Sequence, residues 1–187
     1  MLRCGLIGLR SCGKTAIFNA ITAAGVSSYN NNEMNEAIVN YVRLKYSLLM
    51  GEPTAEDVKI SIGTLIPGKD EFFVVRGRDL ETGLPKSLKL TSSEVREALS
   101  EVTQEIVANI VDTLEETPPE LVSDIMEKGI TLAGGGSLLK GIDKVVSEAT
   151  KMPAYVAEDP MGCVVRGCGV LLEKPNLLQN IRITKGI

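Results

Sequence analysis

The residues best suited to chemistry form an eight-residue string near the start of the chain. Residues 8–15 read G-L-R-S-C-G-K-T, the complete pattern of a phosphate-binding P-loop. In such a loop, Gly8 and Gly13 let backbone N–H groups turn toward phosphate oxygens. Lys14 would reach the terminal phosphates of a nucleotide, and Thr15 would hold its Mg²⁺. The string therefore predicts that the chain binds a nucleotide through its phosphates.

A P-loop requires a strand before it and a helix after it, and the flanking residues fit this order. Residues 2–7 are apolar enough for a buried strand. Residues 14–24 are rich in alanine and place Ile17 and Ile21 one helical turn apart. The sequence predicts a strand, the loop and a helix, so that the helix N-terminus would also favour a bound anion.

The residue types that are missing limit the chemistry. The sequence contains no histidine, which excludes Ser-His-Asp catalysis, Cys-His catalysis and zinc sites with histidine ligands. The 4 cysteines form no C-x-x-C pair, so we expect reduced thiols rather than a metal site. Any chemistry must use carboxylates, lysines, backbone amides and a bound metal ion such as Mg²⁺.

Length and composition indicate a globular protein. The 187 residues are 44% apolar, enough to bury one core or two small subdomains. The 20 Lys and Arg against 24 Asp and Glu give a net charge of −4, and the basic residues are scattered along the chain. Nucleic acid is therefore not an expected partner. Without a signal peptide or a long apolar run, the expected location is cytoplasmic.

Periodicity predicts a mixed α/β chain after residue 32. Helices are expected where apolar residues recur every three or four positions, at residues 33–49, 54–63, 93–117, 119–128, 138–149 and 161–172. Strands are expected at residues 72–76, 85–90, 130–133 and 154–157, the first two as a hairpin. We predict that Thr54 caps the second helix, that Ser92 or Ser93 caps the long one, and that Gly129 ends the fourth.

The first 25 residues resemble the opening strand and helix of Obg-related, YchF-type GTPases. Such GTPases also have an Asp-x-x-Gly element for Mg²⁺ and an Asn-Lys-x-Asp element that reads guanine. Asn-Lys-x-Asp does not occur in this sequence, and the one Asp-x-x-Gly string runs from Asp159 to Gly162, near the other end of the chain. There, Asp159 precedes a proline and is predicted to cap the last helix. A P-loop GTPase that binds GTP remains an alternative.

A longer resemblance covers residues 33–175. The strings E-M-N-E-A-I-V-N-Y-V (33–42), G-E-P-T-A-E-D-V-K (51–59), V-R-G-R-D-L-E-T-G-L-P (75–85), T-P-P-E-L-V-S-D-I (117–125), L-A-G-G-G-S-L-L-K-G (132–141) and V-A-E-D-P-M-G-C-V (156–164) together resemble the carboxy-terminal half of MreB-type rod-shape-determining proteins. The resemblance implies an actin-like, ribonuclease H-like domain II over residues 33–187. A small helix-plus-hairpin subdomain is expected at about residues 50–92, and residues 1–32 would be a P-loop-like strand and helix joined to the domain.

The resemblance also implies a binding site for ATP with Mg²⁺, between two walls. One wall would consist of Glu56, Asp57, Val58 and Lys59, with Glu56 and Lys59 flanking the adenosine. The other would be the run from Gly134 through Gly135, Gly136 and Ser137 to Leu138, where the absence of Cβ atoms lets backbone approach the nucleotide.

The function that the resemblance implies is that of a cytoskeletal protein that determines cell shape. It would bind adenine nucleotide, self-associate into filaments and interact with other proteins of the cell-shape machinery, without inserting directly into the membrane. The two phosphate loops of the family are not recognised in this sequence, so ATP hydrolysis is not expected, and nucleotide binding and filaments should be weakened. A non-functional fusion of two unrelated segments is the remaining alternative.

Overall fold

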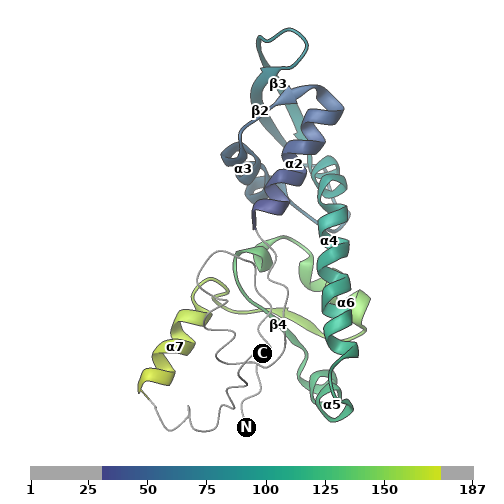
Figure 1. The fold of residues 1–187 in the computed structure, drawn as a ribbon, viewed down its shortest axis with the longest axis vertical. Coiled ribbons are helices and arrows are strands. Elements are labelled where there is room, and N and C mark those ends of the chain that lie inside the picture. The colour runs from purple at the N-terminus through teal and green to yellow at the C-terminus, as the bar shows by residue number, and fades with distance from the viewer. Residues whose placement is uncertain (1–30, 174–187) are drawn as a thin grey trace, which may run out of the picture.

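The computed structural model describes residues 31–173 of the chain (Figure 1). The elements, in chain order, are α2 (Asn31–Tyr46), β1 (Leu48–Leu49), α3 (Glu52–Ile62), β2 (Phe72–Asp79), β3 (Pro85–Thr91), α4 (Ser92–Glu115), α5 (Pro119–Lys128), β4 (Ile130–Leu132), the 3-10 turn η1 (Gly135–Leu138), α6 (Ile142–Thr150), β5 (Ala154–Val156) and α7 (Cys163–Glu173). This mixture confirms the predicted α/β class. The P-loop string and the strand and helix predicted beside it lie outside the described residues.

An antiparallel sheet of three strands, in the order β1-β2-β3, forms one part of the fold. β2 and β3 pair from Phe72 with Thr91 to Arg78 with Pro85, which confirms the predicted hairpin and lengthens its first strand. The inward-facing Val75 is fully buried, and β2 packs against α3 while β3 contacts α4. The helices thus cover one face of this sheet, as its alternation of buried and exposed residues requires.

The second part of the fold is built on β4 and β5, which pair in parallel with Ile130 opposite Ala154. α6 connects the two strands and contacts both β5 and α4. The long helix α4 extends from the hairpin region to this second sheet (Figure 1). Since α4 contacts α2, α3 and β3 as well as α6, it holds the two parts together.

The apolar residues whose recurrence predicted the long helix line its buried face. Val95, Leu99, Ile106 and Ile110 on α4 are buried, and they belong to a core of buried apolar side chains that spans both parts of the fold. Its largest fully buried side chains are Ile38, Leu48, Leu90, Leu99, Val42, Val58, Val75, Val95 and Val146. Burial of this surface supplies the main favourable free energy of folding.

Helix α2 ends earlier than its periodicity predicts. The helix was expected to continue to residue 49, but it stops at Tyr46, and Ser47 has a φ of 51°. A left-handed residue cannot continue a right-handed helix. Leu48 and Leu49 instead form β1 and pair with Asp79 and Arg78 of β2. Leu48 still becomes fully buried, so the apolar pattern is satisfied by a strand rather than by a helix.

Two predicted helix caps were wrong by a few residues. α3 begins at Glu52 with Gly51 at its N-cap, and the Thr54 N–H donates to the Gly51 carbonyl, so Thr54 lies inside the helix. α4 is capped by Thr91, whose side chain accepts from the Glu94 N–H, rather than by Ser92 or Ser93. At α4, Thr91, Ser92 and Ser93 are all suitable capping residues, whereas α3 begins before Thr54 because Pro53 already lies in its first turn. By contrast, α5 ends at Gly129 as predicted.

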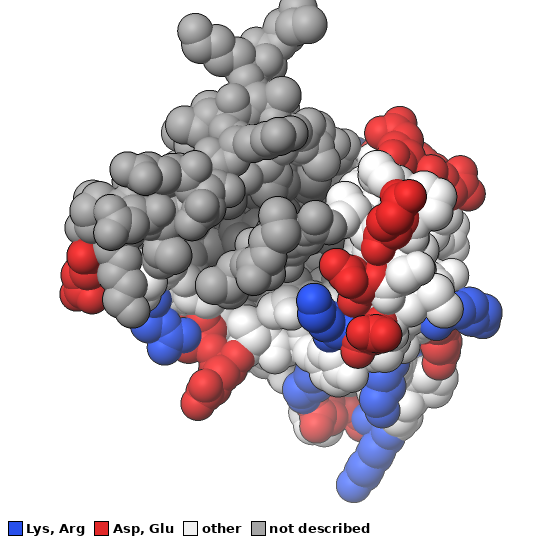
Figure 2. All heavy atoms as spheres, turned by 90° about the horizontal axis from the view of Figure 1, so that it is seen from below, with Lys and Arg blue, Asp and Glu red and all other residues white. Residues whose placement is uncertain are grey.

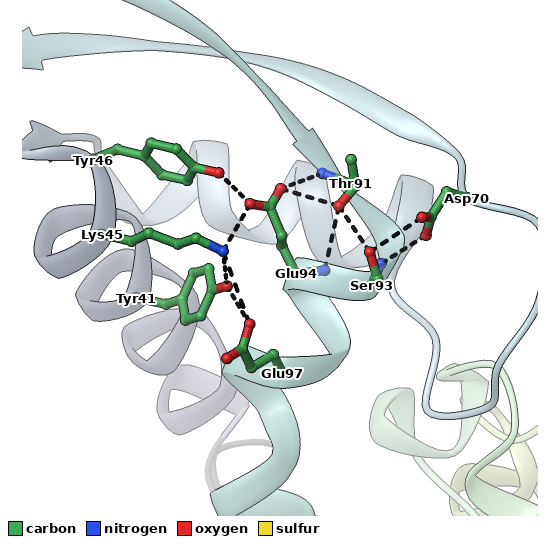
Figure 3. A network of polar contacts seen from close by, with 8 residues as sticks. All are labelled: Tyr41, Lys45, Tyr46, Asp70, Thr91, Ser93, Glu94 and Glu97. Carbon is green, nitrogen blue, oxygen red and sulfur yellow. Dashed lines mark hydrogen bonds and ion pairs between the residues drawn. The ribbon is translucent and has the colours of Figure 1, made fainter.

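A network of polar contacts joins α2 to the start of α4 (Figure 3). The Glu94 carboxylate accepts from the Thr91 N–H at 3.0 Å, pairs with the Lys45 ammonium at 3.0 Å and accepts from the Tyr46 hydroxyl. Burial raises the pKa of Glu94, but the hydrogen bonds that its carboxylate accepts outweigh burial and lower the pKa to about 2. The ionised form of Glu94 therefore stabilises the contact between α2 and α4.

This network predicts a specific acid sensitivity. The pKa of Glu94 falls from its ordinary value of 4.5 to about 2 on folding. Its contribution to stability is therefore complete above pH 4.5 and is lost as the pH falls toward 2. Urea unfolding of the wild type and Glu94→Gln should give a difference in free energy that is largest near pH 6 and shrinks below pH 4.5. Since all other carboxylates titrate in both proteins, a difference that is constant with pH would contradict this assignment.

The described surface carries both signs of charge. Figure 2 shows acidic and basic side chains next to one another over the described part of the face seen from below. Such mixing agrees with the scattered basic residues of the sequence. Within residues 31–173, every helix is too short or too polar to cross a membrane.

Candidate functional site

Helix α3 carries the first group of predicted site residues, and they differ in exposure. Glu56 and Asp57 are exposed to solvent. Val58 is fully buried and belongs to the core, so the structure gives it a packing role. Lys59 is also buried, with 9% of its surface exposed. The pair Glu56 and Lys59 therefore differs from an ordinary solvated pair on a helix surface, because its cation lies inside the protein.

The Lys59 ammonium is held by a residue that the sequence analysis did not single out. Its Nζ donates to Asn35 Oδ1 of α2 at 2.8 Å, and Asn35 is only 3% exposed. Burial lowers the pKa of Lys59. The negative charges of Glu56 and Glu52 raise it, but their effect is smaller than that of burial. One feature of the sequence could have identified Asn35: it lies on the face of α2 that also carries the apolar residues Ile38 and Val42. A polar side chain on a buried face requires a hydrogen-bond partner.

The second group of predicted residues forms a tight turn after β4. Gly134 has a φ of 90°, and its N–H donates to the Pro160 carbonyl at 2.6 Å. The buried Ser137 folds back, with its hydroxyl donating to the Gly134 carbonyl at 2.6 Å. The side chain of Leu138 is 60% exposed. Glycine is required at Gly134 because residues with side chains rarely adopt this backbone conformation.

The glycines do not lead directly into an α-helix, although a helix was predicted to begin after them at residue 138. They form the short 3-10 turn η1 (Gly135–Leu138), and α6 begins only at Ile142. Gly141, with a φ of 90°, separates the two elements. The predicted helix from residue 138 was therefore wrong at its start, and the N-terminus of α6 is not formed by the glycine run.

The segments that follow the two groups of predicted residues are joined to each other. Thr64, just after α3, forms a parallel bridge with Lys140, just after η1. The Leu65 N–H donates to the Lys140 carbonyl at 2.8 Å. One turn beyond Lys59, a Cβ atom placed on Gly63 would lie 2.9 Å from Leu139 Cδ1, so these two segments are in close contact. The fold thus places the end of the Lys59 helix directly beside the glycine turn.

Asp159 has the structural role that the sequence predicted. Its Oδ1 accepts from the Gly162 N–H at 3.0 Å, immediately before α7, and its backbone carbonyl accepts from the Cys163 N–H. An aspartate in this position stabilises the first turn of the helix. The Asp-x-x-Gly string is therefore a helix cap.

The chemistry of this region suits a polar organic ligand. A buried cation, two exposed carboxyl-bearing neighbours on the same helix and a turn without Cβ atoms offer charge, hydrogen bonds and close backbone approach. Within residues 31–173, no group of three or more Asp, Glu, Cys or His side chains could hold a metal ion. Gly8, Gly13, Lys14 and Thr15 lie outside the described residues, so the structure does not relate them to this region.

Comparisons with known proteins agree on one family. The model of the MreB/Mbl protein family matches residues 7–180, a range that includes the whole P-loop string at residues 8–15. The chain is 44% identical over 168 residues to the cell shape-determining protein Mbl of Bacillus cereus, covering 89% of this chain and 49% of that protein. It is 44% identical over 156 residues to the cell shape-determining protein MreB of Escherichia coli, covering 83% of this chain and 45% of that protein. The chain thus spans about half the length of the curated relatives it matches.

Solved structures agree with these sequence relatives. The MreB5 protein of Spiroplasma citri bound to ADP has a TM-score of 0.75 and 37% identity, covering 81% of this chain and 46% of that one. A MamK double helical filament has a TM-score of 0.66 and 22% identity, covering 79% of this chain and 46% of that one. At this level of identity, the similarity supports the actin-like fold alone. None of these relatives supports the YchF-type GTPase alternative. The extent of the family match and the level of identity show that the chain belongs to the MreB/Mbl protein family.

Proposed function

We propose that this chain binds an adenine nucleotide between α3 and the glycine turn, and that it self-associates into filaments that help determine cell shape. The observation that carries the proposal is the direct contact between the end of the Lys59 helix and the segment after Gly136. It is supported by the MreB5 protein of Spiroplasma citri, which was solved bound to ADP and to AMPPNP.

In this proposal, each wall of the site has a distinct role. Lys59 and Glu56 flank the adenosine, with the ammonium as donor and the carboxylate as acceptor, and Asp57 lies alongside them. Gly135 and Gly136 allow the nucleotide to approach the backbone. Gly134, Ser137 and Leu138 belong to the same wall, and Ser137 holds the turn in shape through its hydrogen bond to Gly134. Mg²⁺ would enter with the phosphates of ATP.

The proposed self-association rests on the family. MreB and Mbl relatives are described as cell shape-determining proteins. We propose that residues 33–187 act as one actin-like domain II, in which the hairpin region at about residues 50–92 is a small subdomain, and that residues 1–32 form a separate P-loop-like strand and helix. We propose further that the protein acts in the cytoplasm together with other cell-shape proteins.

Nucleotide titration tests the proposed site. Fluorescent ADP should bind the wild-type chain, and Lys59→Met should weaken binding at least tenfold, because the variant keeps the length of the side chain but removes its charged donor. Lys128→Met is the matched control: Lys128 is an exposed lysine in the last turn of α5, and its removal should leave affinity within twofold.

Competition with unlabelled nucleotides defines the specificity. ATP and ADP should displace the probe, and GTP should displace it less well. Equal affinity of the wild type and Lys59→Met for ADP would overturn the proposed site. An unchanged melting temperature in saturating Mg-ATP would overturn nucleotide binding itself, because a ligand that binds the native state must stabilise it.

A further inference from the structure

We propose that Asn35 of α2 is a positioning residue for nucleotide binding, acting through the Lys59 ammonium. This inference rests on the proposed function of Lys59 and assigns part of that function to a different helix. The two residues are 24 positions apart in the sequence, and their side chains meet in a hydrogen bond of 2.8 Å.

The geometry of the contact fixes which atoms meet. A lysine ammonium can only donate, so the amide of Asn35 must present its oxygen to Nζ. Both side chains are buried, at 3% and 9% exposure. A hydrogen bond to a charged group in such surroundings is stronger than one at the surface. Through this bond, α2 helps to hold the Lys59 ammonium in place.

Packing on α2 makes Asn35 a rigid support. Its neighbour Met34 and the residues Ile38 and Val42 are buried in the core, and α2 packs directly against α3. Because these contacts hold the helix, the Asn35 oxygen has a fixed place relative to Lys59. A flexible lysine side chain loses conformational entropy when it binds a ligand, and a side chain that is already held in place loses less.

The amide is suited to this role because it is neutral. It accepts one of the three N–H groups of the ammonium without cancelling its charge. The nearby carboxylates that act on Lys59, Glu52 and Glu56, lie on α3 itself. A neutral acceptor from α2 therefore orients the cation without adding a further negative charge beside an anionic nucleotide.

A double-mutant cycle with fluorescent ADP tests the assignment. Asn35→Leu, which has a similar volume but no acceptor, should weaken binding about tenfold, equivalent to about 1.4 kcal/mol. Asn35→Asp keeps an acceptor oxygen but adds a negative charge; the charge should cost at most about threefold in affinity, less than the loss from Asn35→Leu. If Asn35 acts through Lys59, the variant carrying both Asn35→Leu and Lys59→Met should bind no more weakly than Lys59→Met alone.

The outcomes separate this inference from the proposed function. If Lys59→Met weakens binding but Asn35→Leu does not, Asn35 has no positioning role while the nucleotide site stands. If the losses from the two substitutions add in the double variant, Asn35 acts independently of Lys59 and the inference is wrong. If neither wild type nor variants bind ADP, the proposed function itself fails. Melting temperatures measured without nucleotide identify any variant that is unfolded. If Asn35→Leu is unfolded, the ADP affinity of Asn35→Asp decides. An affinity within threefold of the wild type supports the inference, and a tenfold loss overturns it.

Discussion

Replacing Leu99 by alanine is expected to lower the free energy of unfolding by about 3 to 4 kcal/mol. Leu99 is fully buried near the first third of α4 and belongs to the core that α4 shares with α2 and the hairpin. Truncation removes apolar contacts and leaves a cavity, and both effects destabilise the native state. Because a domain of this size is stabilised by only about 5 to 15 kcal/mol, the loss is a large fraction of the total.

Urea unfolding followed by circular dichroism would measure this effect. Glu101→Ala is the matched control, because Glu101 is exposed on the same helix and alanine is a good helix former. The control should change the free energy of unfolding by less than about 0.5 kcal/mol. A loss below about 1 kcal/mol for Leu99→Ala would show that α4 is not the central element of the core.

Replacing Gly129 by alanine is expected to cost about 3 kcal/mol, for a different reason. Gly129 joins α5 to β4 with a φ of 78° and a ψ of 179°, a conformation that is essentially restricted to glycine. An added Cβ would lie 2.7 Å from the Pro153 carbonyl oxygen, which already accepts the Ile130 N–H. The substitution therefore combines backbone strain with a steric clash against the pairing of β4 and β5.

Hydrogen exchange adds a local test of this prediction. The Ile130 amide should exchange faster in Gly129→Ala than in the wild type, because its acceptor is displaced. Gly68→Ala is the control, since Gly68 has no positive φ and a Cβ there would meet nothing within 4 Å. That substitution should be neutral or slightly stabilising. Equal stability of the two alanine variants would contradict the role assigned to the Gly129 backbone.

These two positions affect the candidate site differently. Leu99 supports the hairpin region and the helices α2 and α4 that pack around it, whereas Gly129 fixes the start of β4, which leads directly into the glycine turn. We therefore expect ADP affinity to respond to Gly129→Ala even at low temperature, where the variant is folded. The difference follows from the positions of the two residues in the chain. Gly129 precedes Gly134 of the glycine turn by five residues, whereas Leu99 is distant from that turn in the sequence.

Local patterns in the sequence predicted most of the described elements. The helical stripe on α4, the hairpin of β2 and β3, the end of α5 at Gly129 and the cap at Asp159 all depend on residues close to one another in the chain. The errors concern where elements begin and end. Thr91 rather than Ser92 caps α4, and Leu48 and Leu49 form a strand although their spacing also fits a helix.

The sequence by itself determined the family, the α/β class and the two segments that carry the candidate site, because motifs and periodicity are local properties. Tertiary structure alone decided that the ammonium of the buried Lys59 meets Asn35 and that Thr64 forms a bridge with Lys140. Each of these contacts joins residues at least 24 positions apart. Their formation depends on how α2, α3 and the glycine turn pack around a shared core, and no local pattern specifies that packing.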